Sequence, residues 1–145
     1  MVPLLAQQLE AAGFKVTQDV REYNQIESEA LAGKFHAVLV SRSTVLDSGD
    51  AVAYMTADFS SSGSYSMSGL HDEKVDAAIS KAAATQPGDE RHKAIMAAEQ
   101  AILASGAAIP LAHERVIQGE AAGVSGAQRD PGERALITSA TTVKK

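Results

Sequence analysis

Apolar residues recur at helical spacing in the first third of the chain. Residues 3–12 place three leucines on one face, and Gly13 follows where such a helix would end. Residues 23–32 return to the same spacing, and Gly33 is suited to end that helix. A third, short helix is expected over residues 51–59. The pattern therefore predicts three short amphipathic helices before residue 60.

Two longer helices are predicted in the second half. Asp72 is a plausible N-cap for the first, whose buried face is expected to comprise Val75, Ala78, Ile79 and Ala82. The second spans residues 87–104, with Pro87 in its first turn and Asp89 and Glu90 at the positive end of the helix dipole. The side chains expected to face inward from it are Ile95, Met96, Ile102 and Leu103.

The segments between these helices have the patterns of strands. Residues 14–20 (FKVTQDV) alternate apolar and polar side chains, and residues 35–40 (FHAVLV) are almost continuously apolar. Ile109, Leu111 and Val116 indicate an extended segment, although Pro110 bars it from the centre of a sheet. One more strand is expected near residues 135–137. Strands alternating with helices predict an α/β fold.

Composition and motifs exclude several classes of function. The chain has 145 residues, a net charge of −5 without a basic stripe, and no cysteine, so we expect no nucleic-acid partner, thiolate nucleophile or cysteine metal site. The histidines at 36, 71, 92 and 113 lack metal-ligand spacing, and no serine lies in a G-x-S-x-G motif. We expect neither cofactor, nor metal, nor enzymatic activity.

Residues 60–69 (SSSGSYSMSG) are rich in serine and glycine. Such a composition is typical of a solvated, mobile linker, and an ordered loop is an equally good interpretation. The sequence alone leaves both open.

Four motifs resemble family 5 extracytoplasmic solute-binding proteins, the dipeptide, oligopeptide and nickel receptors of ABC importers. The stretch 66–82 (SMSGLHDEKVDAAISKA) is similar to the family's N-Y-S-G-Y-S-N-P-E-V-D and the helix after it. The stretch 88–114 resembles a D-x-x-x-R helix ending in A-x-I-P-L-Y. Near the front, AQQLEAAGFKV and ALAGKFHAVLV resemble two further family patterns, in the family's order. The matching positions are Gly69, Val75, Asp76, Arg91, Glu99, Ala108, Ile109, Pro110 and Leu111.

The resemblance implies a fold and a function. It implies a truncated, type II periplasmic-binding-protein-like lobe over residues 1–118, an α/β unit with a mixed sheet flanked by helices. Residues 119–145 would be an irregular segment returning toward a first lobe, and Pro110 would lie in a strand at a sheet edge or hinge. The implied function is to bind a peptide or other small solute between two lobes and deliver it to ABC permease subunits. We expect an extracytoplasmic protein, periplasmic or tethered as a lipoprotein, whose export signal lies outside this chain.

The loop after residues 35–40 is the expected ligand contact, because strand ends in open α/β sheets direct loops into the crevice. Arg42 and Val45 stand where the family has tryptophan and aspartate in G-W-x-A-D-Y-x-D-P. Since a valine cannot hold a peptide's amino terminus, Arg42 is interpreted either as the partner of an anionic ligand group or as a surface arginine. The full set of candidate ligand-binding residues is Arg42, Ser43, Thr44, Asp47, Tyr65 and Ser66.

Two further interpretations remain open. The chain could be a stand-alone α/β interaction or regulatory module without a transport role, or, with less support, an unrecognised hydrolase or transferase. Apolar residues after the last predicted helix, among them Ile109, Leu111, Val116 and Ile117, also indicate an exposed patch that would favour a homodimer.

Overall fold

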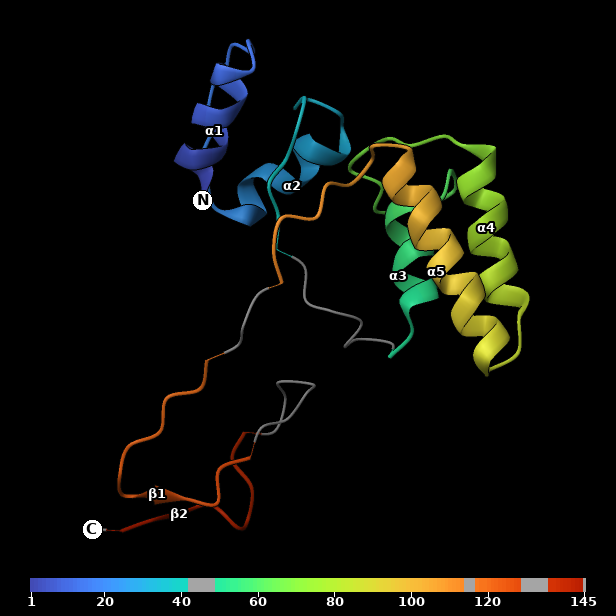
Figure 1. Ribbon diagram of the computed structural model, residues 1–145. Coiled ribbons are helices and arrows are strands. Elements are labelled where there is room, and N and C mark those ends of the chain that lie inside the picture. Colours follow the sequence, from blue (N-terminus) through green and yellow to red (C-terminus); the bar gives the residue numbers. More distant parts are fainter. Residues whose placement is uncertain (42–48, 114–116, 129–135, 145) are drawn as a thin grey trace.

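The computed structural model describes residues 1–41, 49–113, 117–128 and 136–144 (Figure 1). Five helices and two very short strands make up its regular structure in the described part of the chain. The elements, in order, are α1 (Val2–Ala11), α2 (Tyr23–Leu31), α3 (Ala51–Phe59), α4 (Glu73–Ala84), α5 (Asp89–Ala104), β1 (Val124–Ser125) and β2 (Thr142–Val143).

The helices lie where the apolar periodicity predicted them, and their ends follow local chemistry. Asp72 is the N-cap of α4, and its carboxylate accepts hydrogen bonds from the amides of Lys74 and Val75 at 2.8 and 3.4 Å. Gly13, which follows α1, has a φ of 95°, a value that favours glycine. The prediction for Pro87 is wrong: Gly88 is the N-cap of α5, so Pro87 precedes the helix instead of lying in its first turn.

Helices α3, α4 and α5 pack side by side as a three-helix bundle (Figure 1). The connection over residues 85–88 is short, so α4 and α5 are neighbours along the chain as well as in space. The buried core of this bundle consists of Val52, Met55, Val75, Ile79, Ala82, Ala94, Ala98 and Ile102.

The face of α5 that packs inward was predicted in part, because Ile102 is buried and Ile95 packs against the core as expected. Ala94, Ala98 and Ile102 are buried, whereas Met96 and Leu103 are 45% and 39% exposed. Small alanine side chains allow α5 to approach α3 and α4 closely. The prediction was wrong for Met96 and Leu103, although the helical period itself was predicted correctly.

The predicted fold class is wrong. The described residues are mostly helical, with 44% of them in helices and a single tiny two-stranded sheet, and do not form an α/β lobe with a mixed sheet flanked by helices. That sheet pairs β1 with β2 in antiparallel register, with Val124 opposite Val143 and Ser125 opposite Thr142. It lies apart from the helices in Figure 1, at the C-terminal end of the chain.

The segments predicted as strands form no sheet with one another. Residues 14–20 and 35–40 are not in strands, and neither are residues 108–113 or 136–137; Val116 and Ala135 lie outside the described residues. Residues 15–20, 35–40 and 108–113 make no backbone hydrogen bond to another described residue. Alternating or continuous apolar side chains predict a strand only where a partner strand is available, and the described chain supplies none to these segments.

Side-chain contacts hold α2 to its surroundings. Arg21, just before α2, pairs with Asp19 at 2.8 Å and with Glu29 of α2 at 3.1 Å. The guanidinium also lies over the ring of Phe35, 5.8 Å from its centroid, so it joins the segments on both sides of α2.

Among the described helices, none has the length and apolar character needed to cross a membrane.

Candidate functional site

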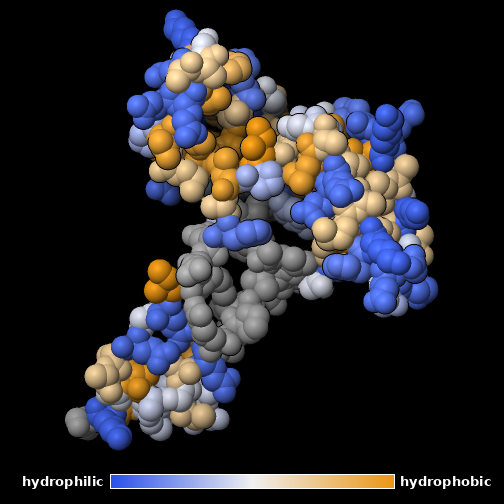
Figure 2. Space-filling model, viewed as in Figure 1, coloured by the Kyte–Doolittle hydropathy of each residue, from blue (hydrophilic) through white to orange (hydrophobic). Residues whose placement is uncertain are grey.

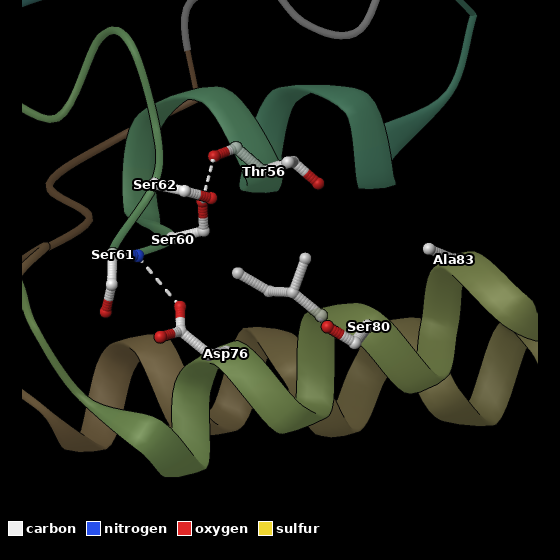
Figure 3. Close-up of a pocket in the computed structure, with 8 residues that line it drawn as sticks. Thr56, Ser60, Ser61, Ser62, Asp76, Ser80 and Ala83 are labelled. Carbon is white, nitrogen blue, oxygen red and sulfur yellow. Dashed lines mark hydrogen bonds between the residues drawn. The ribbon is translucent and has the colours of Figure 1, made fainter.

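A hydroxyl-rich hollow lies between α3, the loop that follows it, and α4 (Figure 3). Its volume is about 350 Å³, near the lower end of the range for small-molecule sites. The residues that line it are Thr56, Ser60, Ser61, Ser62, Asp76, Ile79, Ser80 and Ala83. Five of these eight residues carry a hydroxyl group, and Ile79 also belongs to the bundle core.

Part of this polar lining is used to end helix α3. The hydroxyl of Thr56 donates to the carbonyl oxygen of Val52 at 2.8 Å, and the hydroxyl of Ser60 donates to the carbonyl oxygen of Thr56 at 2.7 Å. The Ser60 and Ser62 hydroxyls are 3.3 Å apart. Ser60 is 6% exposed, so its bonds satisfy a buried polar group. Thr56, Ser62 and Ser80 are the more exposed hydroxyl-bearing residues of the hollow.

Asp76 supplies the negative charge at the edge of the hollow. Its carboxylate accepts a hydrogen bond from the backbone amide of Ser61 at 2.8 Å, the dashed line between the two residues in Figure 3. The hydroxyl and the amide of Ser61 favour the charged form and hold the pKa of Asp76 below its usual value, and the charge of His71 adds to this effect. The carboxyl group is therefore ionised at neutral pH.

Residues 60–69 form an ordered turn in the structure, which decides between the two interpretations of that stretch. Tyr65 donates its backbone amide to the carbonyl oxygen of Ala57 at 3.0 Å, and Gly63 donates to that of Ser60 at 2.9 Å. Gly63 lies so close to α3 that a Cβ at this position would meet the carbonyl oxygens of Ala57 and Thr56. The loop is thus packed against the helix that it leaves.

Of the predicted ligand-binding residues, only Tyr65 and Ser66 belong to the described part. Neither lines the hollow. The Tyr65 hydroxyl is hydrogen-bonded to the hydroxyl of Tyr23 at the start of α2. Burial, together with Tyr23 and Glu27, raises the pKa of Tyr65 well above its usual value. Tyr65 therefore joins the turn to α2, while the hydroxyl of Ser66 lies 3.5 Å from that of Ser68.

Arg42, Ser43, Thr44 and Asp47 lie outside the described residues. The structure therefore neither places them beside the hollow nor separates them from it. They remain predictions of the sequence.

A second polar contact, not anticipated from the sequence, fastens α5 to α3. Asp50 is the N-cap of α3 and accepts from the amide of Val52 at 3.0 Å, and its other oxygen accepts from Arg91 of α5 at 2.7 Å. The amide of Val52 and then the guanidinium of Arg91 lower the pKa of Asp50. An aspartate just before an apolar helix is a signal for the cap, but no local pattern indicates the partner 41 positions away.

In the described residues no group of three or more histidine or carboxylate side chains is placed to hold a metal ion. The one buried serine of the hollow, Ser60, donates its hydroxyl to a backbone carbonyl, and no histidine lines the hollow. A hydroxyl activated as a nucleophile needs a neighbouring base, and the carboxylate in the lining, Asp76, accepts a hydrogen bond from the backbone amide of Ser61.

Comparison with known proteins gives no further information. No family model matches the chain, and neither a curated protein nor a solved structure is significantly similar to it. The resemblance to family 5 solute-binding proteins therefore rests on the quoted motifs alone.

Proposed function

We propose that the chain is part of the solute receptor of an ABC importer, and that it binds a small polar solute such as a peptide without transforming it. Permease subunits are the expected macromolecular partner. The observation that carries the proposal is that three residues matching the receptor motifs, Val75, Asp76 and Arg91, take part in contacts that join α3, α4 and α5.

Three of the matching positions make this point. Val75 is 1% exposed at the centre of the core, and its neighbour Asp76 fixes the loop after α3 through the amide of Ser61. Arg91 joins α5 to the start of α3 through Asp50. These three matching residues therefore contribute to the packing of the bundle, whereas the matching residues Ile109 and Leu111 are exposed.

The hollow beside Asp76 has the chemistry of a contact for a peptide-like solute. An ionised carboxylate attracts an ammonium group, and the hydroxyls of Ser62 and Ser80 can donate to or accept from an amide. The apolar side chains of Ile79 and Ala83 complete the lining. A small number of polar groups beside apolar side chains is typical of small-molecule sites.

A titration with mixed di- and tripeptides tests this function. We expect saturable heat in calorimetry and no change in the peptides by mass spectrometry. Ser80→Tyr fills the hollow and should weaken binding by about tenfold or more, equivalent to roughly 1.4 kcal/mol. Ala77→Tyr is the matched control, since Ala77 is an exposed position of the same helix that does not line the hollow.

The outcomes separate the site from the function. If both variants still bind peptide as the wild type does, the receptor function stands and the solute binds to residues outside the hollow. The absence of binding for every peptide pool, with circular dichroism showing intact helices, contradicts the proposal for this class of solute. Turnover of any peptide contradicts the non-enzymatic part.

An interaction module without a transport role is the second candidate. Its support is the exposure of large apolar side chains outside the bundle: Ile109 is 77% exposed and Ile117 is 88% exposed. Figure 2 shows hydrophobic side chains on the surface between the part that holds α1 and α2 and the bundle. Such surface tends to be covered by a partner. Co-purification of a stoichiometric protein partner, with no peptide binding, would favour this candidate.

A further inference from the structure

We propose that residues 14–20 are a docking surface for a second copy of this chain, which pairs with them as an antiparallel strand centred on Thr17. The segment runs from the end of α1 to the start of α2, which lies near the N-terminus in Figure 1. The proposal does not depend on the receptor function.

The backbone of this segment is available for pairing. Residues 15–20 make no backbone hydrogen bond to another described residue, and all of residues 14–20 are exposed except Val16, which is half-buried. Phe14 and Val20 are 64% and 76% exposed. Unpaired amide and carbonyl groups in a row are a template for adding a strand. Exposed apolar side chains next to them add a hydrophobic gain when the strand is covered.

The sequence of the segment is complementary to itself, which identifies the occupant. Antiparallel pairing about Thr17 places Lys15 of each copy opposite Asp19 of the other. The same register places Phe14 opposite Val20, an aromatic side chain against a β-branched one. Opposite charges and such apolar pairs both stabilise neighbouring strands. A two-fold axis makes each pair occur twice.

The existing contacts of Asp19 are compatible with this arrangement. Arg21 donates to both carboxylate oxygens of Asp19, at 2.9 and 2.8 Å, and thereby holds the carboxylate on the exposed side of the segment. A carboxylate has about four acceptor positions, so Lys15 of a second copy can bind it as well.

The other two segments without backbone hydrogen bonds to other described residues, 35–40 and 108–113, carry no pattern that would identify a partner strand. Residues 35–40 carry no charged side chain that would fix a register or a partner, apart from the titratable His36. Residues 108–113 contain Pro110, which removes one donor from any ladder. Residues 14–20 alone combine an unpaired backbone with a self-complementary charge pattern.

Sedimentation equilibrium of charge-swapped variants tests the proposal. Lys15→Glu places glutamate opposite aspartate, and Asp19→Lys places lysine opposite lysine, so each variant alone should dimerise at least about tenfold more weakly than the wild type. An equimolar mixture of the two should restore dimers, because every opposing pair in the mixed dimer is again of opposite charge. Lys74→Glu makes the same charge change outside the segment and should associate like the wild type.

Two results would overturn the proposal. One is a wild-type protein that stays monomeric up to about 1 mM, a concentration at which even weak dimers are detected. The other is a mixture that associates no better than its components, which would place any self-association elsewhere, including the apolar residues after α5. Circular dichroism of each variant confirms that the helices are intact. Thr17→Pro, which removes a central donor without changing charge, should abolish the dimer independently.

Discussion

At the scale of single residues, two carboxylates link loops to helices and make the fold sensitive to acid. Asp50 accepts from Val52 and Arg91, and Asp76 accepts from Ser61. The pKa of each is lowered in the folded protein, so the unfolded chain binds protons more readily than the folded one. The free energy of unfolding therefore rises with pH over the range in which these two carboxyl groups titrate.

We expect stability to be fully present at neutral pH and to fall as the pH drops below about 4, through the pKa values that Asp50 and Asp76 have in the folded protein. Urea denaturation measured from pH 7 downward checks this. The double variant Asp50→Asn, Asp76→Asn should be less stable at neutral pH and should lose less stability on acidification. An equally steep acid loss in the double variant would assign the sensitivity to other carboxylates.

At the scale of elements, the connection between α3 and α4 depends on a glycine. A Cβ at Gly63 would lie 2.8 Å from the carbonyl oxygen of Thr56 and would also meet that of Ala57, and both are backbone atoms of α3. The φ of Gly63 is not in the left-handed region, so the requirement is for space. The serine-rich stretch is thus an ordered part of the bundle.

Gly63→Ala should lower the free energy of unfolding by about 1–3 kcal/mol, the usual cost of forcing an atom into packed structure. Gly119→Ala is the control, because a Cβ there meets nothing within 4 Å. Its effect should stay within about 0.5 kcal/mol. Chemical denaturation of the two variants measures both values. Equal small effects would mean that the loop moves away from α3 at little cost.

The elements also separate what the sequence could predict from what it could not. Helices are local: their period is contained in each segment, and Asp72 and Gly13 mark boundaries within a few residues. The predicted strands at 14–20 and 35–40 failed because a strand needs a partner that the pattern of one segment does not specify. The hollow was missed for the same reason, since Thr56 and Ser80 line one hollow only when α3 packs on α4.

At the scale of the whole molecule, apolar residues divide into a buried set in the bundle and an exposed set outside it. Ile102 on α5 is 4% exposed, and Ile109, seven positions later, is 77% exposed. Large apolar side chains on α1 and in the segments around α2 are exposed as well, among them Leu4 at 57%. Exposed apolar side chains of this extent are common where another polypeptide covers them, so we expect part of this surface to bind a partner.

The same substitution at two isoleucines tests this division. Ile102→Ala should cost about 2–5 kcal/mol of unfolding free energy, because it leaves a cavity between α5 and its neighbours. Ile109→Ala should change it by no more than about 0.5 kcal/mol in the isolated chain, because most of the side chain is already in water. Chemical denaturation of the wild type and both variants gives the two differences, at a protein concentration low enough to keep the chain monomeric. A large loss for Ile109→Ala would mean that the segment after α5 packs onto the bundle in solution. If Ile109 instead contacts a partner, the variant that leaves folding unchanged should weaken that complex.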